Sequence, residues 1–294
     1  MKFEDYNPYF SVEHTRRPIS SFSEDKHIDI DLFDENICDR IIELTPVLDE
    51  LPPEIMQGII IDSAWKSSKI EGSSYTLADS VELAATGEMN PDKDEKSGLI
   101  VRNHLDVLSM ENFDLTVDGI SLVNKMLLRD FDASGGILRG YVNIDISASS
   151  YIPPVSPKLD KMMNTLFVAI KNASIINKAL YLMTSLPALQ LFMDGNKRTS
   201  RMSAVHVLMQ NNILPFSIVN MDKNEYLWSL IAFYETGDTQ PIRDIMLDGW
   251  AHSIMRTAQE GALSVIDYDR KHHELVERIE GEDIGMSHTN FDMS

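Results

Sequence analysis

The sequence predicts an all-α fold with one small β-hairpin, and three observations carry this prediction. Apolar residues recur at helical spacing through most of the 294 residues. Strand-like alternation is prominent in one place, 134–154, where Val142, Ile144 and Ile146 alternate with polar neighbours between glycines and prolines. No internal repeat or low-complexity tract interrupts the pattern. A helical bundle with a hairpin at 134–154 is therefore expected.

The helices are expected in a regular succession along the chain. Pro53 suits the first position of a helix and Gly72 suits its end, which predicts a helix at about 54–72. The other helices are expected at 35–50, 76–87, 97–111, 115–129, 157–172, 175–190, 195–211, 223–236 and 240–263. The polar stretch 87–96 is the best candidate for a boundary in the first half of the chain.

Three regions follow from this succession. Residues 1–95 are expected to form an N-terminal helical region and residues 96–255 the core, and residues 256–294 are expected to be a polar, acidic tail. Within the first region, residues 1–33 are predicted to be an extended arm that packs across a surface through aromatic side chains. The tail is expected to hold one exposed helix at 268–280 and then to be disordered.

Composition and charge exclude several classes of protein. The formal net charge of −20 argues against non-specific binding to nucleic acid, which needs a basic surface. The chain has a single cysteine, Cys38, which cannot form an internal disulfide and suits a reducing compartment. The first ten residues lack the apolar core of a signal peptide, and no apolar run is long enough to cross a bilayer. We expect a cytoplasmic protein that binds neither nucleic acid nor membrane.

The segment LQLFMDGNKRTSR at 189–201 looks built to hold phosphate. Asp194 is a hard oxygen ligand that suits Mg²⁺. Gly195 lets the backbone approach a ligand closely, and Asn196 would begin a helix whose first amides form an anion site. Arg198 and Arg201 are three residues apart and share a helix face beside those amides. The predicted phosphate site is Gly195, Asn196, Lys197, Arg198 and Arg201, with Asp194 as the metal ligand.

From Phe192 to Arg201 the sequence resembles the signature of Fic/DOC (Fido) domains, which reads His-Pro-Phe-x-Asp/Glu-Gly-Asn-x-Arg-x-x-Arg. Such domains transfer AMP, or less often another phosphate-containing group, from a nucleotide to a protein hydroxyl. The resemblance implies that Asp194 holds Mg²⁺ and that amides around Gly195 and Asn196 cradle the phosphates of ATP. It implies that the two arginines bind the β- and γ-phosphates. A Fic-type helical bundle with a flap is the implied fold.

Other segments extend the resemblance over about 55–255. The stretch 134–154 is similar to the flap of the family, which pins a target segment by strand addition. Residues 234–238 are similar to a YExGD-like segment. The resemblance implies that an unidentified protein target docks at the flap, and it is compatible with a homodimer. The flap residues concerned are Gly136, Arg139, Val142, Asn143, Ile144 and Tyr151.

The segment Ser67–Gly72 resembles the family's N-terminal inhibitory motif, (Ser/Thr)-x-x-x-Glu-(Gly/Asn), as in class II-like members. Ser67 and Glu71 are four residues apart, on one face of the predicted helix, just before Gly72. The helix dipole disfavours a carboxylate at this end, so Glu71 needs a cation nearby. The resemblance names Arg201 as that cation. A bidentate pair between Glu71 and Arg201 is expected to misorient ATP.

The catalytic histidine of the family falls at Gln190. A glutamine amide can donate and accept hydrogen bonds but cannot take the proton of an attacking hydroxyl. Loss of a general base typically lowers the rate by ~10²–10⁴. His206 would lie ~15 Å from the helix mouth and cannot replace the base, His104 has no predicted place, and Asp145 is a conceivable base in the flap.

Two functions from different classes remain open. The first is a catalytically impaired, nucleotide-binding Fic-like module that senses ATP or docks a partner. The second is a slow or divergent transferase that acts on a protein Ser, Thr or Tyr hydroxyl, which would explain why the inhibitory Glu71 is present.

Overall fold

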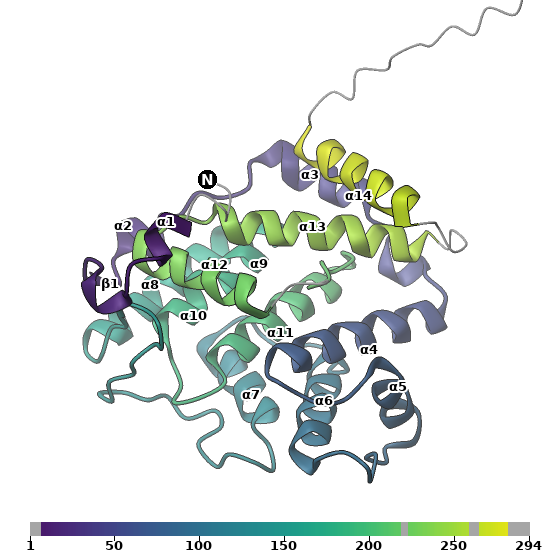
Figure 1. Ribbon diagram of the computed structural model, residues 1–294, viewed down its shortest axis with the longest axis horizontal. Coiled ribbons are helices and arrows are strands. Elements are labelled where there is room, and N and C mark those ends of the chain that lie inside the picture. The colour runs from purple at the N-terminus through teal and green to yellow at the C-terminus, as the bar shows by residue number, and fades with distance from the viewer. Residues whose placement is uncertain (1–6, 219–222, 259–264, 282–294) are drawn as a thin grey trace, which may run out of the picture.

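The computed structural model describes residues 7–218, 223–258 and 265–281 and confirms the all-α class (Figure 1). The helices are α1 (Asn7–Phe10), α2 (Glu24–His27), α3 (Glu35–Leu44), α4 (Pro53–Ile70), α5 (Leu77–Thr86), α6 (Glu95–Leu108), α7 (Val117–Leu127), α8 (Lys158–Asn172), α9 (Ile175–Met183), α10 (Ser185–Leu189), α11 (Asn196–Met209), α12 (Lys223–Thr236), α13 (Gln240–Thr257) and α14 (Val265–Glu280). The two strands are β1 (Ser20–Ser21) and β2 (Tyr151–Ile152). Among the described helices, none is long and apolar enough to cross a membrane.

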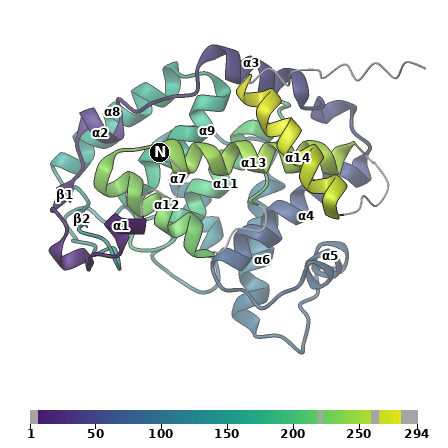
Figure 2. The same ribbon diagram turned by 45° about the horizontal axis from the view of Figure 1, so that its top comes forward.

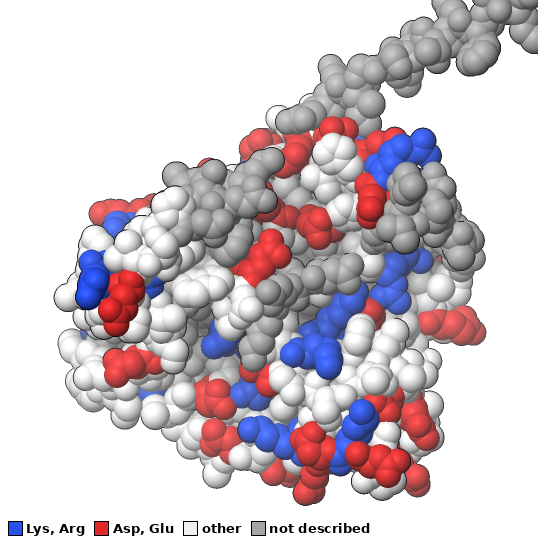
Figure 3. Space-filling view, in the orientation of Figure 1, with Lys and Arg blue, Asp and Glu red and all other residues white. Residues whose placement is uncertain are grey.

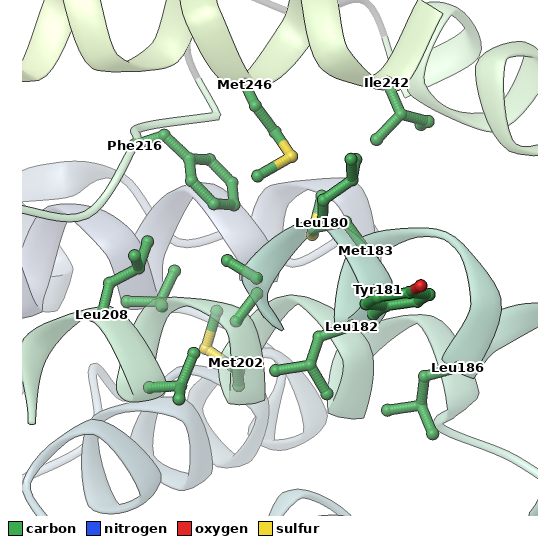
Figure 4. Close-up of a cluster of buried hydrophobic side chains, with 14 of the residues drawn as sticks. Leu180, Tyr181, Leu182, Met183, Leu186, Met202, Leu208, Phe216, Ile242 and Met246 are labelled. Atoms are coloured by element: carbon green, nitrogen blue, oxygen red, sulfur yellow. The ribbon is translucent and has the colours of Figure 1, made fainter. Parts of the chain in front are cut away.

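Helix α11 is the centre of the fold. It packs against α4, α6, α7, α9 and α10. Figure 4 shows the apolar cluster around it, with Met202 and Leu208 from α11 facing Leu180 and Met183 from α9, and Met246 reaching in from α13. Because this helix is enclosed on most sides, its two arginines near the N-terminus are buried as well.

The helices of the N-terminal region begin and end where local chemistry predicts. Pro53 occupies the start of α4, where its missing amide hydrogen costs nothing. At the start of α5, Thr76 and Asp79 form a reciprocal capping box, and Gly87 ends the helix in the left-handed region at φ +74°. Helix α4 packs against α6 and reaches α11, so its C-terminus lies beside the central helix.

The expected hairpin at 134–154 does not form, and the segment is a loop that contains β2. An isolated two-stranded hairpin is marginal in water, and here other groups take the backbone partners. The guanidinium of Arg139 donates to the Val142 carbonyl at 2.5 Å, so a side chain is the partner of this backbone acceptor. Ala148 turns the chain at φ +64°, and β2 pairs with β1 rather than with a neighbouring strand of the same loop.

The N-terminal arm packs across a surface as expected, but from Asn7 onward it is not extended throughout, because it contains the short helices α1 and α2. Its strand β1 pairs in parallel with β2, with Ser20 opposite Tyr151. Figures 1 and 2 both place α1 and β1 beside α12. The arm therefore covers the loop before β2 and one side of α12.

The helix expected at 268–280 is confirmed as α14, but it is not simply exposed. It packs against α13 and α3, as both ribbon views show. Its Ile279 is fully buried, and Arg40 of α3 donates its Nε–H to the Ile279 carbonyl at 2.7 Å. The expected disorder after residue 281 lies outside the described residues.

Candidate functional site

The loop before α11, residues 190–195, is the predicted phosphate loop. It is preformed by a set of local hydrogen bonds. Gly195 adopts φ +79°, which positions the first amides of α11 to point outward from the helix end. The side chain of Asn196 closes the loop, because its Oδ1 accepts from the Phe192 amide at 3.0 Å and its Nδ2 donates to the Phe192 carbonyl at 2.8 Å. These contacts fix the loop without any ligand.

Asn124 of α7 is a site residue that the sequence analysis missed. Its Nδ2 donates to the Asp194 carbonyl and to Thr199 Oγ1, both at 3.0 Å. Its Oδ1 accepts from the Gly136 amide at 2.8 Å. The Asn124 side chain therefore joins the phosphate loop to the start of the flap loop, residues 134–154. A Cβ on Gly195 would lie 2.8 Å from this Nδ2, so the loop admits glycine only. The sequence held one signal for this role, because Asn124 is a polar residue on the apolar face of a predicted helix.

The two arginines of α11 share one carboxylate. Arg201 is fully buried, and its Nη2 lies 2.6 Å from Glu71 Oε1. The other carboxylate oxygen, Oε2, lies 3.4 Å from Arg198 Nε. The expected bidentate pair between Glu71 and Arg201 is therefore wrong, because each oxygen faces a different arginine. Arg201 Nε instead donates to Ser67 Oγ at 3.0 Å, which brings Ser67 into the same network.

The C-terminus of helix α4 places Glu71 beside the two arginines. Glu71 is the C-terminal cap of α4, and Gly72 follows at φ +90°, a conformation that glycine adopts readily. Burial alone would raise the pKa of Glu71, but the charges of Arg201 and Arg198 outweigh it and lower the pKa to about 2. The carboxylate therefore stays ionised and paired at neutral pH.

We expect the contribution of Glu71 to stability to vanish in acid. Because its folded-state pKa lies below its unfolded value, the contribution is complete above pH ~4.5 and is lost as the pH falls towards about 2. The difference in free energy of unfolding between the wild type and Glu71→Gln should shrink by about 2–3 kcal/mol over that window. Urea unfolding from pH 8 to 3 measures it, and a difference independent of pH would contradict the pairing.

Gln190 occupies the place where the resemblance expects a histidine, and both halves of its amide are engaged. Its Nε2 donates to the Pro187 carbonyl at 2.8 Å, and its Oε1 accepts from Asn196 Nδ2 at 3.0 Å. The residue is buried in the left-handed region at φ +49°. Its side chain therefore supports the phosphate loop and has no basic group to offer.

Of the other candidates for a base, the two histidines are unsuited. His104 is fully buried, and burial lowers its pKa to about 3, with the charges of Arg201 and Arg198 adding to the effect. His206 is buried and does not line the pocket, and burial lowers its pKa too. Asp145 lines the pocket and is exposed, so it stays the conceivable base that the sequence suggested.

A pocket of about 470 Å³ opens between the phosphate loop, the loop before β2 and α12. It brings together many of the predicted site residues from three separate segments. These are Glu71, Ile144, Gln190, Asp194, Gly195, Asn196, Lys197 and Arg198. The remaining candidates do not line it; they are Ser67, Gly72, Gly136, Arg139, Val142, Asn143, Tyr151 and Arg201. The apolar wall from α12, with Leu227 and Trp228, was not foreseen.

Two of the predicted flap residues are buried and support the site from below. Arg139 donates to the Pro154 carbonyl at 2.5 Å, to the Leu189 carbonyl at 3.1 Å and to the carbonyl of Gln190. Tyr151 donates its hydroxyl to the Ala188 carbonyl at 2.8 Å. These bonds fix the backbone around Gln190. A docking role for the flap stays a prediction.

The comparison with protein families decides which domain this is: the model of the Fic/DOC family matches residues 114–208. The chain carries a Fic/DOC domain. The matched range holds α7, the flap loop and the phosphate loop with most of α11, whereas Glu71 and α12 lie outside it. No curated protein matches the chain.

Solved structures share the fold of the Fic/DOC domain and of its surroundings. Fic-1 (residues 134–508) from C. elegans aligns with a TM-score of 0.59 at 19% identity, over 76% of this chain and 69% of that one. A Fic family protein from Desulfovibrio desulfuricans G20 aligns with a TM-score of 0.61 at 18% identity, over 81% and 84%. A Fic domain containing signaling protein from Bacteroides thetaiotaomicron VPI-5482 aligns with a TM-score of 0.57 at 17% identity, over 84% and 97%.

Proposed function

We propose that this chain is a Fic-type ATP-binding protein, related to protein adenylyltransferases, whose transfer chemistry is impaired at Gln190. One observation carries the proposal. The phosphate loop is preformed and lines a pocket, while Gln190 beside it is an amide whose Nε2 is bound to Pro187 of α10 and whose Oε1 is bound to Asn196. Binding and positioning are thus supported, and proton removal is not.

The pocket suits a nucleoside triphosphate in size and in chemistry. Its volume of about 470 Å³ lies within the usual range for ligand sites, ~300–1,000 Å³. Lys197 and Arg198 line it beside the N-terminus of α11, so side-chain charge and helix amides act together on an anion. Figure 3 shows Lys and Arg side chains gathered over α4 on one face of the molecule, although the chain is acidic overall, whereas the pocket's Lys197 and Arg198 belong to α11.

Asp194 would hold the magnesium ion. Its side chain is 57% exposed, and one carboxylate combined with phosphate oxygens is a usual way for proteins to bind Mg²⁺. Within the described residues no three His, Cys, Asp or Glu side chains form a metal cluster, so the phosphates must supply further ligands. Asp194 Oδ2 is paired with Arg198 Nη2 at 2.8 Å, and this pair would have to open. The ion would neutralise phosphate charge.

Glu71 would act as a brake on this site. It lines the pocket and holds Arg201 and Arg198 through one oxygen each. Those guanidinium groups are the ones that would bind the β- and γ-phosphates. While the carboxylate is present, the terminal phosphate meets a negative charge and cannot engage both arginines, so the bound nucleotide is misaligned.

Binding of Mg·ATP tests the proposal. Replacing Arg198 by alanine should weaken binding about tenfold or more, because a charge-assisted contact to phosphate is worth ~1.5–3 kcal/mol. Calorimetry measures the dissociation constants. Arg129→Ala is the matched control, since this arginine lies outside the pocket and pairs with Asp106 on the surface. Equal binding by all three proteins would contradict the proposal.

A slow or divergent transferase is the second candidate, and the intact Glu71–Arg201 pair favours it. A carboxylate that occupies both arginines suggests a reaction that has to be restrained. Its substrate would be a protein Ser, Thr or Tyr hydroxyl, with Asp145 on the pocket wall as the conceivable base. Transfer of label from α-labelled ATP to protein by Glu71→Gly, with Gln190 kept, supports this candidate over the impaired one.

The flap loop offers a surface for the protein target. Ile137, Tyr141 and Val142 are 62%, 75% and 48% exposed, an unusual grouping of apolar side chains within six residues. We propose that the unidentified target docks on these side chains. We also propose that the protein acts in the cytoplasm. A homodimer of this chain is a further proposal that the family resemblance supports.

A further inference from the structure

Glu235, near the end of α12, joins three parts of the chain through one buried carboxylate. Its Oε1 accepts from Ser149 Oγ and from the Ser150 amide, both at 2.8 Å. Its Oε2 accepts from the Tyr9 hydroxyl at 2.5 Å, and Arg17 Nη2 lies 3.2 Å from Oε1. The N-terminal arm, the loop before β2 and α12 therefore meet at this group.

The arm reaches the pocket wall through the same contacts. Arg17, whose side chain is 2% exposed, donates to the carbonyl of Ala148, which lines the pocket. The ring of Phe10 lies 4.7 Å from that of Trp228, another lining residue. The Ser20 amide donates to the Ser150 carbonyl at 3.3 Å, which continues the pairing of β1 with β2. Both the loop and the α12 wall are thus braced from outside by the arm.

The pocket has two kinds of lining with separate supports. Its polar lining, the phosphate loop, is fixed by Asn124, Asn196 and Gln190. The contacts of Tyr9, Phe10 and Arg17 given above go instead to α12 and to the loop before β2. Its apolar lining comes from the loop before β2 and from α12, with Ile144 and Trp228 among its members. The arm therefore bears directly on the apolar lining, and its link to the phosphate loop is indirect, through β2 and the Tyr151 hydroxyl.

We infer that the arm, residues 7–22, is a positioning element that sets the preference of this pocket for a nucleotide over a bare polyphosphate. Arg17 and Glu235 are its positioning residues. They hold the wall against which a base and ribose would pack, while the phosphate loop works without them. The inference rests on the proposed function, because it requires a phosphate-bearing ligand in the pocket.

The physical reason lies in the kind of contact that holds the arm near the pocket. The buried pair between Arg17 and Glu235 is the charged part of this attachment, beside the two-residue strand pairing and the buried Phe22. Removing one partner of a buried pair leaves an uncompensated charge, which is costly. The apolar lining would then lose its fixed position. The base of a nucleotide would lose packing against it, whereas a polyphosphate makes no such contact.

The test compares Mg·ATP with magnesium tripolyphosphate by calorimetry, on the wild type, Glu235→Gln and Phe10→Ala. Phe10→Ala removes the contact with Trp228 without leaving a buried charge, so it keeps the test valid if Glu235→Gln folds poorly. Arg16→Ala is the matched control, because this side chain of the arm is 78% exposed and does not contact Glu235. Both test variants should weaken ATP binding about tenfold and leave tripolyphosphate binding within about twofold.

The outcomes separate the two proposals. A wild type that binds neither ligand refutes the proposed function, and this inference with it. A wild type that binds both, with variants that lose both equally or lose neither, refutes the inference alone. A wild type that binds ATP but not tripolyphosphate also refutes the inference, because the phosphate loop would then not be an independent subsite.

Discussion

Restoring a histidine at position 190 in a Glu71→Gly background should raise AMP transfer by ~10²–10⁴ over Glu71→Gly alone, the usual contribution of a general base. In the present chain the Gln190 amide is bound to Pro187 and Asn196, and the phosphate loop beside it is already formed. Positioning and charge are thus in place, and the base is the part that Gln190→His supplies. Label from α-labelled ATP in protein measures the gain.

Two further variants make this result specific. Gln190→His with Glu71 kept should stay slow, because the carboxylate still occupies the arginines. Gln190→Asn with Glu71→Gly controls for disturbance of the loop without adding a base. If the double variant with histidine transfers no more label than the asparagine control, the missing base is not what impairs the site.

Replacing Arg201 by methionine should destabilise the fold by about 3 kcal/mol, at the lower end of the cost of breaking a buried ion pair. Arg201 is fully buried, so its removal takes from the Glu71 carboxylate its nearest cation and leaves that charge only partly compensated. The cost stays near the lower end because Glu71 is 18% exposed and keeps Arg198 at 3.4 Å. Equilibrium unfolding in urea measures the loss.

A double-mutant cycle separates the charge from the packing. Adding Glu71→Gln to Arg201→Met removes the stranded charge and should recover about half of the lost stability or more. An additive result, with the two single losses summing in the double variant, would mean that the pair seen between Glu71 and Arg201 contributes nothing to stability.

The sequence predicted the site best where local chemistry decides the structure. Helix α4 ends at Glu71 because Gly72 stops it, and α11 begins at Asn196 because Gly195 turns the chain. Both ends depend on neighbouring residues, so both could be read from spacing. The contact of Glu71 with Arg201 came from the family resemblance, and the structure contains it.

The features that sequence reasoning missed depend on partners far away in the chain. The hairpin does not form because β2 pairs with β1, about 130 residues earlier, and the Val142 carbonyl of the same loop accepts from the Arg139 side chain. The role of Asn124 requires knowing that α7 lies beside the phosphate loop. The two oxygens of Glu71 face different arginines because of side-chain geometry that residue spacing does not encode.

The most direct test of the central claim is Mg·ATP binding by calorimetry on the wild type and on Glu71→Gly. The claim is that a preformed phosphate site is restrained by one carboxylate. Both proteins should bind, and Glu71→Gly should bind about tenfold more tightly, because its two arginines are free to meet the phosphates. Equal affinities would show that Glu71 does not restrain nucleotide binding. The absence of binding at millimolar nucleotide would contradict the phosphate site itself.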